Sequence, residues 1–113
     1  MSYSYCVMIT TTGNQEEANR LARILVSRQL AACVQITSIT SWYTWKGVVN
    51  QEAEFLLLIK TATHLYHEVE ATILENHSYE TPEIIQLPIE QGLDRYLGWI
   101  KENTRSAQDQ EQR

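Results

Sequence analysis

The sequence has few cysteines, a deficit of basic residues and no long hydrophobic run. Its two cysteines, Cys6 and Cys33, form neither a CxxC pair nor a zinc-finger spacing. The formal net charge of −5 argues against nonspecific binding to nucleic acid or to an anionic membrane. No apolar stretch approaches the roughly 20 residues that a membrane span needs, and the first residues lack the pattern of a signal peptide. We therefore expect reduced thiols and a cytoplasmic location.

The composition is otherwise that of a globular protein. Hydrophobic residues make up 43% and charged residues 20% of the 113 residues, enough to bury a core. We expect a single domain over residues 1–104. Residues 105–113 are polar, and we expect them to form a disordered tail.

The longest feature is a β-hairpin predicted over residues 41–61. β-Branched and aromatic residues flank Lys46 and Gly47, and the glycine can supply the positive φ of a tight turn. A two-residue loop at this position predicts three cross-strand pairs: Trp45 with Val48, Tyr43 with Asn50, and Ser41 with Glu52.

The two faces of this hairpin differ in chemistry. Because side chains alternate along a strand, Glu52, Glu54 and Lys60 share one face with Tyr43 and Trp45. The other face is expected to be core and carries Phe55, Leu57 and Ile59.

The remaining segments alternate between strand and helix patterns. The predicted strands cover residues 3–12, 30–36 and 84–89. The predicted helices cover residues 15–29, a segment capped by residues 61–63 and ending at residue 76, and a short segment after Gly92. The order is β-α-β-β-α-β with an added C-terminal helix. This order predicts an α+β, ferredoxin-like sandwich in which two helices cover one face of a four-stranded antiparallel sheet.

Two local features refine this prediction. Asn14 followed by Glu17 resembles a capping box, in which the asparagine caps the first helix and the glutamate reaches back. The apolar alternation slips between Ile36 and Ile39, which predicts a bulge at Thr37 and Ser38.

The hairpin is longer than its helices can cover. Strands of about 16 residues span roughly 50 Å, whereas helices of similar residue count span only about 25 Å. The tip therefore carries Trp42, Tyr43 and Trp45 beyond the core. We expect another subunit to cover these rings.

Six short motifs follow one another between residues 30 and 99 of the chain. They are Leu30-Ala-Ala-Cys33, Trp42-Tyr-Thr-Trp-Lys-Gly47, Glu52-Ala-Glu54, Ile59-Lys-Thr61, His77-x-Tyr79-x-x-Pro82-Glu83 and Tyr96-Leu-x-Trp99. In this order and spacing they resemble the CutA family of divalent-cation tolerance proteins. The resemblance implies a homotrimer similar in outline to PII signalling proteins, with hairpins that embrace neighbouring subunits and polar clefts between them. The family has been associated with tolerance of copper and other divalent metals, and its animal members with anchoring of acetylcholinesterase.

The sequence departs from the family pattern at two positions. Thr10 stands where some bacterial members carry a cysteine, and Ser78 stands where proline is common. The first departure removes one proposed soft ligand for copper.

Eight residues are candidates for the cleft. They are Cys33, Trp45, Glu52, Glu54, Lys60, His77, Tyr79 and Glu83. Paired carboxylates suit hard cations, amines or acid–base chemistry, and Cys33 with His77 would be the metal ligands, for Cu²⁺ or another divalent cation.

A simpler reading exists for each candidate. Cys33 between apolar residues is also typical of a small buried side chain. The glutamates could be solvated charges or partners of Lys60, and a loop histidine is commonly solvated. His64 and His67, three residues apart on a helix, are better explained as solvent-facing.

Three functions remain open at this point. The first is a non-enzymatic trimer that requires no cofactor, binds a small polar molecule or a divalent cation in its clefts, and signals to a protein partner. The second is an enzyme that uses Cys33 or a carboxylate with help from His77, although no nucleophile–base spacing is visible. The third is a structural trimer whose clefts are incidental.

Overall fold

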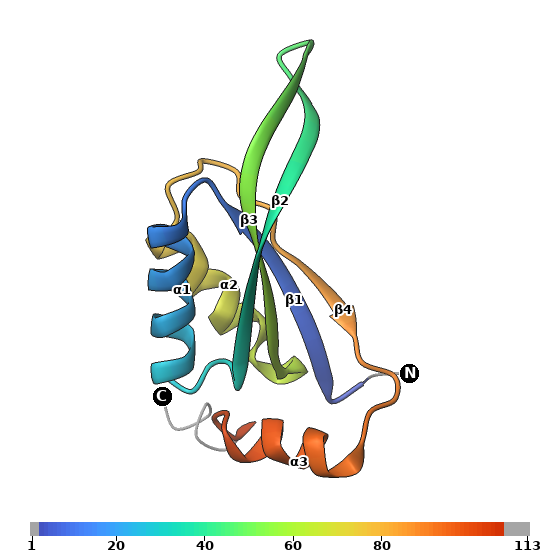
Figure 1. Ribbon diagram of the computed structural model, residues 1–113. Coiled ribbons are helices and arrows are strands. Elements are labelled where there is room, and N and C mark those ends of the chain that lie inside the picture. Colours follow the sequence, from blue (N-terminus) through green and yellow to red (C-terminus); the bar gives the residue numbers. More distant parts are fainter. Residues whose placement is uncertain (1–2, 108–113) are drawn as a thin grey trace.

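The computed structural model describes residues 3–107 and confirms the α+β, ferredoxin-like fold. Its elements are β1 (Tyr5–Thr12), α1 (Gln15–Ser27), β2 (Cys33–Trp45), β3 (Val48–Ala62), the 3₁₀ turn η1 (Thr63–Leu65), α2 (Tyr66–Asn76), β4 (Ile85–Pro88) and α3 (Asp94–Glu102). The strands form one antiparallel sheet in the order β2-β3-β1-β4. Helices α1 and α2 lie on one face of this sheet, and α3 lies at its end (Figure 1).

The core lies between the sheet and the two helices. Met8 on β1 and Leu57 and Ile59 on β3 are fully buried against Leu21 of α1 and Val69 of α2. On the strands the buried residues recur at every second position, and on α1 and α2 they recur at helical spacing. Burial of these apolar side chains against one another therefore stabilises the strands and the helices at the same time.

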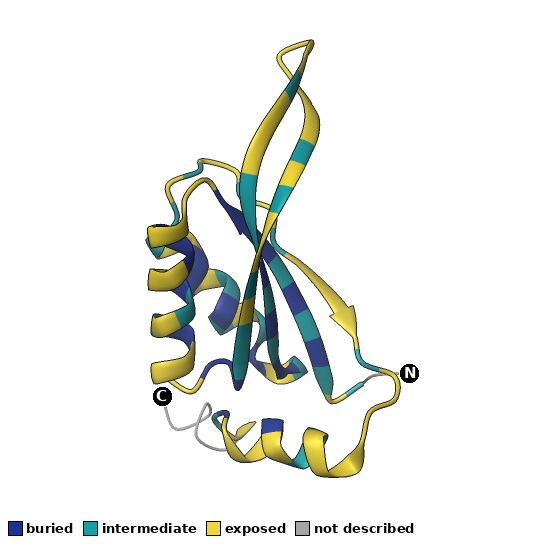
Figure 2. Cartoon of the chain, viewed as in Figure 1, coloured by how far each residue is buried: buried dark blue, intermediate teal, exposed yellow. Residues whose placement is uncertain are grey.

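The hairpin has the predicted register. Trp45 pairs with Val48, and the turn residues Lys46 and Gly47 have φ values of 51° and 78°. Both values lie in the left-handed region that a two-residue hairpin turn requires. Trp42 and Trp45 are 67% and 57% exposed. The distal half of the hairpin projects beyond the helices and is mostly exposed (Figure 2).

The predicted bulge at Thr37 and Ser38 is wrong. These residues pair with Leu56 and Phe55 in a register that runs without interruption from Cys33 to the turn. The apolar pattern shifts for another reason. Ile36 lies on the face of β2 that packs against the helices. At Ile39 the strand has passed beyond the helices, so neither face is required to be apolar there.

The end of α1 also differs from the prediction. The helix ends at Ser27, and Gln29 adopts a φ of 58°, which lets the Leu30 N–H donate to Leu25 O at 2.9 Å. This left-handed residue satisfies the helix carbonyls and delays the next strand to Cys33.

Arg105, the first residue of the expected tail, contacts the folded part of the chain. Its N–H donates to Gln29 O and its guanidinium pairs with Glu68 at 2.9 Å. Residues 108–113 of the predicted tail lie outside the described part of the chain.

The sheet face opposite α1 and α2 is apolar and open. Val7, Ile9 and Leu58 lie on this face and are only partly buried. Ile85 and Leu87 on β4 continue it and are 46% and 50% exposed. Within residues 3–107, neither α1 nor α2 packs on this face, so it is available to another chain.

Candidate functional site

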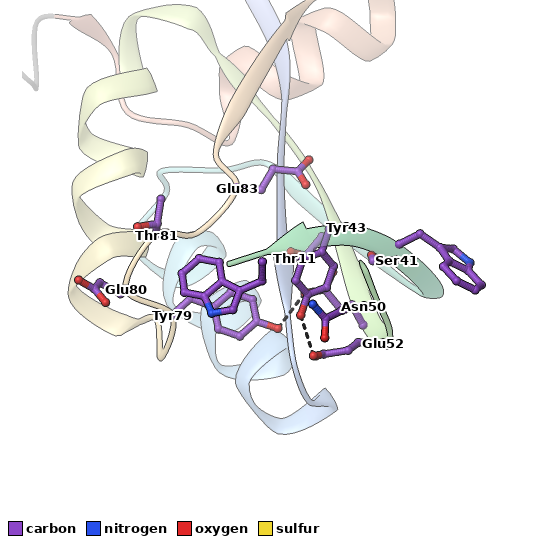
Figure 3. Close-up of a pocket in the computed structure, with 12 residues that line it drawn as sticks. Thr11, Ser41, Tyr43, Asn50, Glu52, Tyr79, Glu80, Thr81 and Glu83 are labelled. Carbon is purple, nitrogen blue, oxygen red and sulfur yellow. Dashed lines mark hydrogen bonds between the residues drawn. The ribbon is translucent and has the colours of Figure 1, made fainter. Parts of the chain in front are cut away.

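A pocket of about 750 Å³ lies between the hairpin and the loop over residues 79–83. Strand β1 reaches its edge through Thr11. The hairpin contributes from both strands, because Tyr43 on β2 and Asn50 on β3 are cross-strand partners. Figure 3 shows these side chains and the loop that borders them. This volume is typical of a site for a small molecule.

The lining of the pocket is aromatic and acidic. Its aromatic rings are Trp42, Tyr43, Trp45 and Tyr79. Its carboxylates are Glu52, Glu54, Glu80 and Glu83. No lysine, arginine or histidine in residues 3–107 lines it, so the pocket carries a concentrated negative charge.

Two tyrosines orient the central carboxylates. Tyr43 donates to Glu52 Oε1 at 2.6 Å, and Tyr79 donates to Glu54 Oε2 at 2.8 Å (Figure 3). The hydrogen bond to Glu52 raises the pKa of the Tyr43 hydroxyl, and burial together with the hydrogen bond to Glu54 raises the pKa of Tyr79. Both tyrosines therefore stay protonated donors at neutral pH, and one oxygen of each carboxylate remains for a ligand.

His77 supports the pocket from behind and does not line it. Its ring is fully buried, its Nε2–H donates to Thr11 O at 2.7 Å, and its Nδ1 accepts the Tyr79 N–H at 3.0 Å. Because Nδ1 accepts a hydrogen bond from the Tyr79 N–H while Nε2 lies against a carbonyl oxygen that can only accept, the ring is the neutral Nε2–H tautomer. The 3.6 Å approach of Nδ1 to Glu17 is then a contact between a neutral ring and a carboxylate.

The sequence analysis missed several pocket residues. Tyr43 and Asn50 follow from the predicted hairpin register, since they lie on the same face as Trp45 and Glu52. The loop residues beside Tyr79 carried no signal of their own, because their position depends on how the loop returns to the hairpin.

Glu17 was interpreted only as part of a helix cap. Asn14 Oδ1 does accept from the Glu17 N–H at 2.8 Å, as the cap predicts. The Glu17 side chain instead accepts from Ser78 N at 2.6 Å and Ser78 Oγ at 2.9 Å. The capping box is therefore half formed.

Cys33 and Lys60 lie away from the pocket. They are cross-strand partners near the end of the sheet, where Lys60 donates to Gln35 Oε1 and its Nζ lies 6.0 Å from the centre of the Tyr96 ring. Of the eight candidates, five line the pocket, namely Trp45, Glu52, Glu54, Tyr79 and Glu83.

Cys33 and His77 do not come together within one chain. Cys33 pairs with Lys60, whereas His77 bonds to Thr11, which pairs with Leu56. Leu56 and Lys60 are four positions apart along β3, which is about 13 Å at roughly 3.3 Å per residue. Both His77 nitrogens are already hydrogen-bonded, so the ring offers no lone pair to a metal. Across the described residues, no three His, Cys, Asp or Glu side chains are placed to hold a metal ion.

His64 and His67, the two helix histidines, make structural contacts. His64 Nε2 hydrogen-bonds to Arg105 O at 3.0 Å, and His67 packs edge-on against the Tyr66 ring. Neither contact indicates a ligand site. Among residues 3–107, no helix is long and apolar enough to cross a membrane.

Comparisons with known proteins identify relatives over almost the whole chain. Residues 6–103 match the family model described as CutA1 divalent ion tolerance protein. The divalent-cation tolerance protein CutA of Thermus thermophilus is 42% identical over 99 residues, which are 87% of this chain and 96% of that protein. The chloroplastic protein CutA of Arabidopsis thaliana is 43% identical over 101 residues, 88% of this chain and 56% of that longer protein.

Solved structures agree with these relatives. CutA1 from Oryza sativa superposes with a TM-score of 0.90 at 41% identity, covering 94% of this chain and 98% of that one. The periplasmic divalent cation tolerance protein CutA from Archaeoglobus fulgidus has a TM-score of 0.88 at 38% identity, covering 89% and 99%. The matched family is described by divalent-ion tolerance and not by a catalysed reaction. The chain belongs to the CutA1 divalent ion tolerance protein family.

Proposed function

We propose that this chain is a non-enzymatic binding protein that assembles as a homotrimer and takes a small cation in the pocket between its hairpin and the loop over residues 79–83. The ligand is an organic cation, or a hard divalent ion that keeps most of its bound water, because no three carboxylates of one chain's described residues are placed to hold a bare ion. Binding serves divalent-cation tolerance or signalling to a protein partner in the cytoplasm, where the free thiols of Cys6 and Cys33 would stay reduced.

The charge of the pocket carries this proposal. Four glutamates line it, and Lys60 and His77, which the sequence placed there, lie elsewhere. An anionic metabolite would meet uncompensated carboxylates, whereas a cation would neutralise them. The aromatic rings add favourable contacts for an organic cation.

The donor atoms favour some metals over others. Carboxylate and hydroxyl oxygens suit Mg²⁺, Mn²⁺ or Ca²⁺. Copper favours imidazole and thiolate, and the residues of one chain do not fit it, because Cys33 lies about 13 Å along the strand from the position next to His77. A copper site would need ligands from two subunits.

The exposed apolar surface supports the trimer. Leu58 and Ile9 on the open sheet face, together with Trp42 and Trp45 on the hairpin, form two surfaces that a monomer would leave in water. The family resemblance supplies the number of subunits.

The separation of Cys33 from His77 also favours binding over catalysis. A nucleophilic thiol needs a base within hydrogen-bond reach, and His77, the base that the sequence suggested, is buried with both nitrogens hydrogen-bonded elsewhere. The Cys33 thiol instead lies beside Lys60 at the open face.

Native mass spectrometry of protein purified without chelators or metal-affinity resin tests assembly and bound mass together. Titrations of the trimer with Mn²⁺, Cu²⁺ and spermidine then test the ligand class. We expect a trimer that binds Mn²⁺ or spermidine, with weaker binding in Glu52→Gln and Glu54→Gln and no change in the control Glu90→Gln, an exposed residue outside the pocket. Copper binding that is lost in His77→Ala with no effect of the glutamate variants would contradict the proposal, as would a monomer.

A further inference from the structure

Glu17 is a buried carboxylate outside the pocket. The residue is 3% exposed and lies in the first turn of α1. A buried carboxylate is strongly destabilising unless donors satisfy it. Both carboxylate oxygens of Glu17 accept hydrogen bonds from Ser78, one from its N–H at 2.6 Å and one from its hydroxyl at 2.9 Å. These charge-assisted bonds join positions 61 residues apart in the sequence.

His77 holds the loop backbone next to Ser78 in place. Its neutral ring spans the space between Thr11 O and the Tyr79 N–H and packs against the Tyr79 ring at 4.8 Å between centroids. The backbone of residues 77–79 is therefore held on one side by α1 and on the other by β1. Its position is determined before any ligand binds.

Tyr79 links the loop backbone to the pocket. Its hydroxyl orients Glu54, and it passes so close to Gly13 that a Cβ on that glycine would lie 3.1 Å from the hydroxyl oxygen. A shift of the loop by a fraction of an ångström would therefore change the Tyr79–Glu54 bond. The contacts lead from Glu17 through Ser78 and Tyr79 to Glu54.

We propose that Glu17 and Ser78 are positioning residues for this pocket, which set the affinity of Glu54 for a cationic ligand without touching the ligand. This inference rests on the proposed function of the pocket. It also assigns a role to the N-terminus of α1, because a change there is transmitted to the pocket through a buried carboxylate.

A purely structural role makes a different prediction. If Glu17 only ties α1 to the loop, its loss lowers stability and leaves ligand affinity unchanged. If it positions Tyr79, affinity falls, and the effect depends on the Tyr79 hydroxyl. Coupling between the two sites therefore separates the alternatives.

The test compares the trimer with Glu17→Gln and Ser78→Ala in titrations with Mn²⁺ and spermidine. Glu17→Gln keeps the size of the side chain but loses the charge and one acceptor. We expect affinity to fall about tenfold, the loss typical of one hydrogen bond to a charged group. Ser78→Ala removes only the hydroxyl bond of an exposed loop residue, so it should fold normally and lower affinity less. The matched control is Glu16→Gln, an exposed glutamate in the same helical turn.

A double-mutant cycle with Tyr79→Phe completes the test. We expect Glu17→Gln combined with Tyr79→Phe to weaken binding no more than the stronger single substitution, because both act through one hydrogen bond. Additive losses, or unchanged affinity with a lower Tm, would overturn the positioning role.

A ligand-free measurement separates this inference from the proposed function. Hydrogen exchange at the Ser78 and Tyr79 amides should accelerate in Glu17→Gln and not in Glu16→Gln, because both amides donate within the Glu17 and His77 contacts. If wild-type protein binds neither probe, the proposed function fails and the affinity role fails with it. Unchanged exchange at both amides would refute the loop-positioning step whether or not a ligand binds.

Discussion

The Tyr79 hydroxyl donates a 2.8 Å hydrogen bond to Glu54 Oε2 and so links the loop before β4 to the hairpin. The two residues are 25 positions apart, and each belongs to a segment that the rest of the fold holds separately. Both residues line the pocket, and the bond occupies one carboxylate oxygen of Glu54. The first prediction concerns the loss of this bond.

Tyr79→Phe should weaken cation binding, because Glu54 loses the donor that orients it. We expect up to a tenfold loss of affinity and a loss of about 1 kcal/mol in unfolding free energy, measured by titration calorimetry and urea denaturation. Tyr66→Phe is a matched control, since Tyr66 donates a similar 2.8 Å bond to Glu70 outside the pocket. Equal binding by both variants would contradict the role of Tyr79.

Alkaline pH should remove the stabilisation that Tyr79 provides. Burial and the bond to Glu54 raise the pKa of the Tyr79 hydroxyl above its ordinary value of 10.0. Above that value the unfolded chain releases a proton that the folded chain keeps, so stability falls as pH rises. The difference in unfolding free energy between wild type and Tyr79→Phe should be constant at neutral pH and shrink above pH 10.0. A difference that stays constant between about pH 8 and pH 11 would argue against this account.

Gly13→Ala should disturb the pocket from the β1–α1 turn. The added methyl group would lie 3.1 Å from the Tyr79 hydroxyl oxygen, closer than ordinary van der Waals contact. We expect weaker cation binding and a destabilisation of about 1 kcal/mol or more from overpacking. Gly98→Ala is the control, because within the described residues nothing lies within 4 Å of its added Cβ. In the middle of α3 that change should be neutral or stabilising by about 0.5–1 kcal/mol.

Leu58→Asp should separate the subunits. Leu58 lies on the open face of the sheet, where a carboxylate would be buried against a neighbouring chain without a partner. Size-exclusion chromatography with light scattering should report a monomer for this variant and a trimer for Val26→Asp, whose residue is 42% exposed on α1. Circular dichroism checks that both variants are folded. A Leu58→Asp trimer would show that this face is not the interface.

The hairpin could be predicted from the sequence because its determinants are local. Alternation along β3 assigns Glu52 and Glu54 to one face and Leu57 and Ile59 to the other, and a glycine next to Lys46 fixes the turn. Once the turn is known, the three pairs nearest to it follow, from Trp45 with Val48 to Ser41 with Glu52. The same logic gave the cap at Asn14, whose partner is three residues away.

The candidate site depended on contacts that the sequence does not encode locally. Lys60 shares a strand face with Glu54 but lies six residues farther along β3, near α3 and outside the pocket. A pattern with a period of two specifies the face and not the position along it. The tertiary structure alone decides which part of that face meets the loop carrying Tyr79.

Glu17 and His77 show the same limit in a stronger form. From the sequence, Glu17 is a helix-cap residue and His77 is a loop residue, and neither position predicts burial. Both side chains are buried because segments distant in sequence meet there. Local sequence determined the strands, the helices and the hairpin register, since backbone dihedrals and side-chain alternation depend on neighbouring residues. Only the tertiary structure decided the charge of the pocket and the residues that support it, because burial and hydrogen bonding between distant segments arise when the sheet and helices pack.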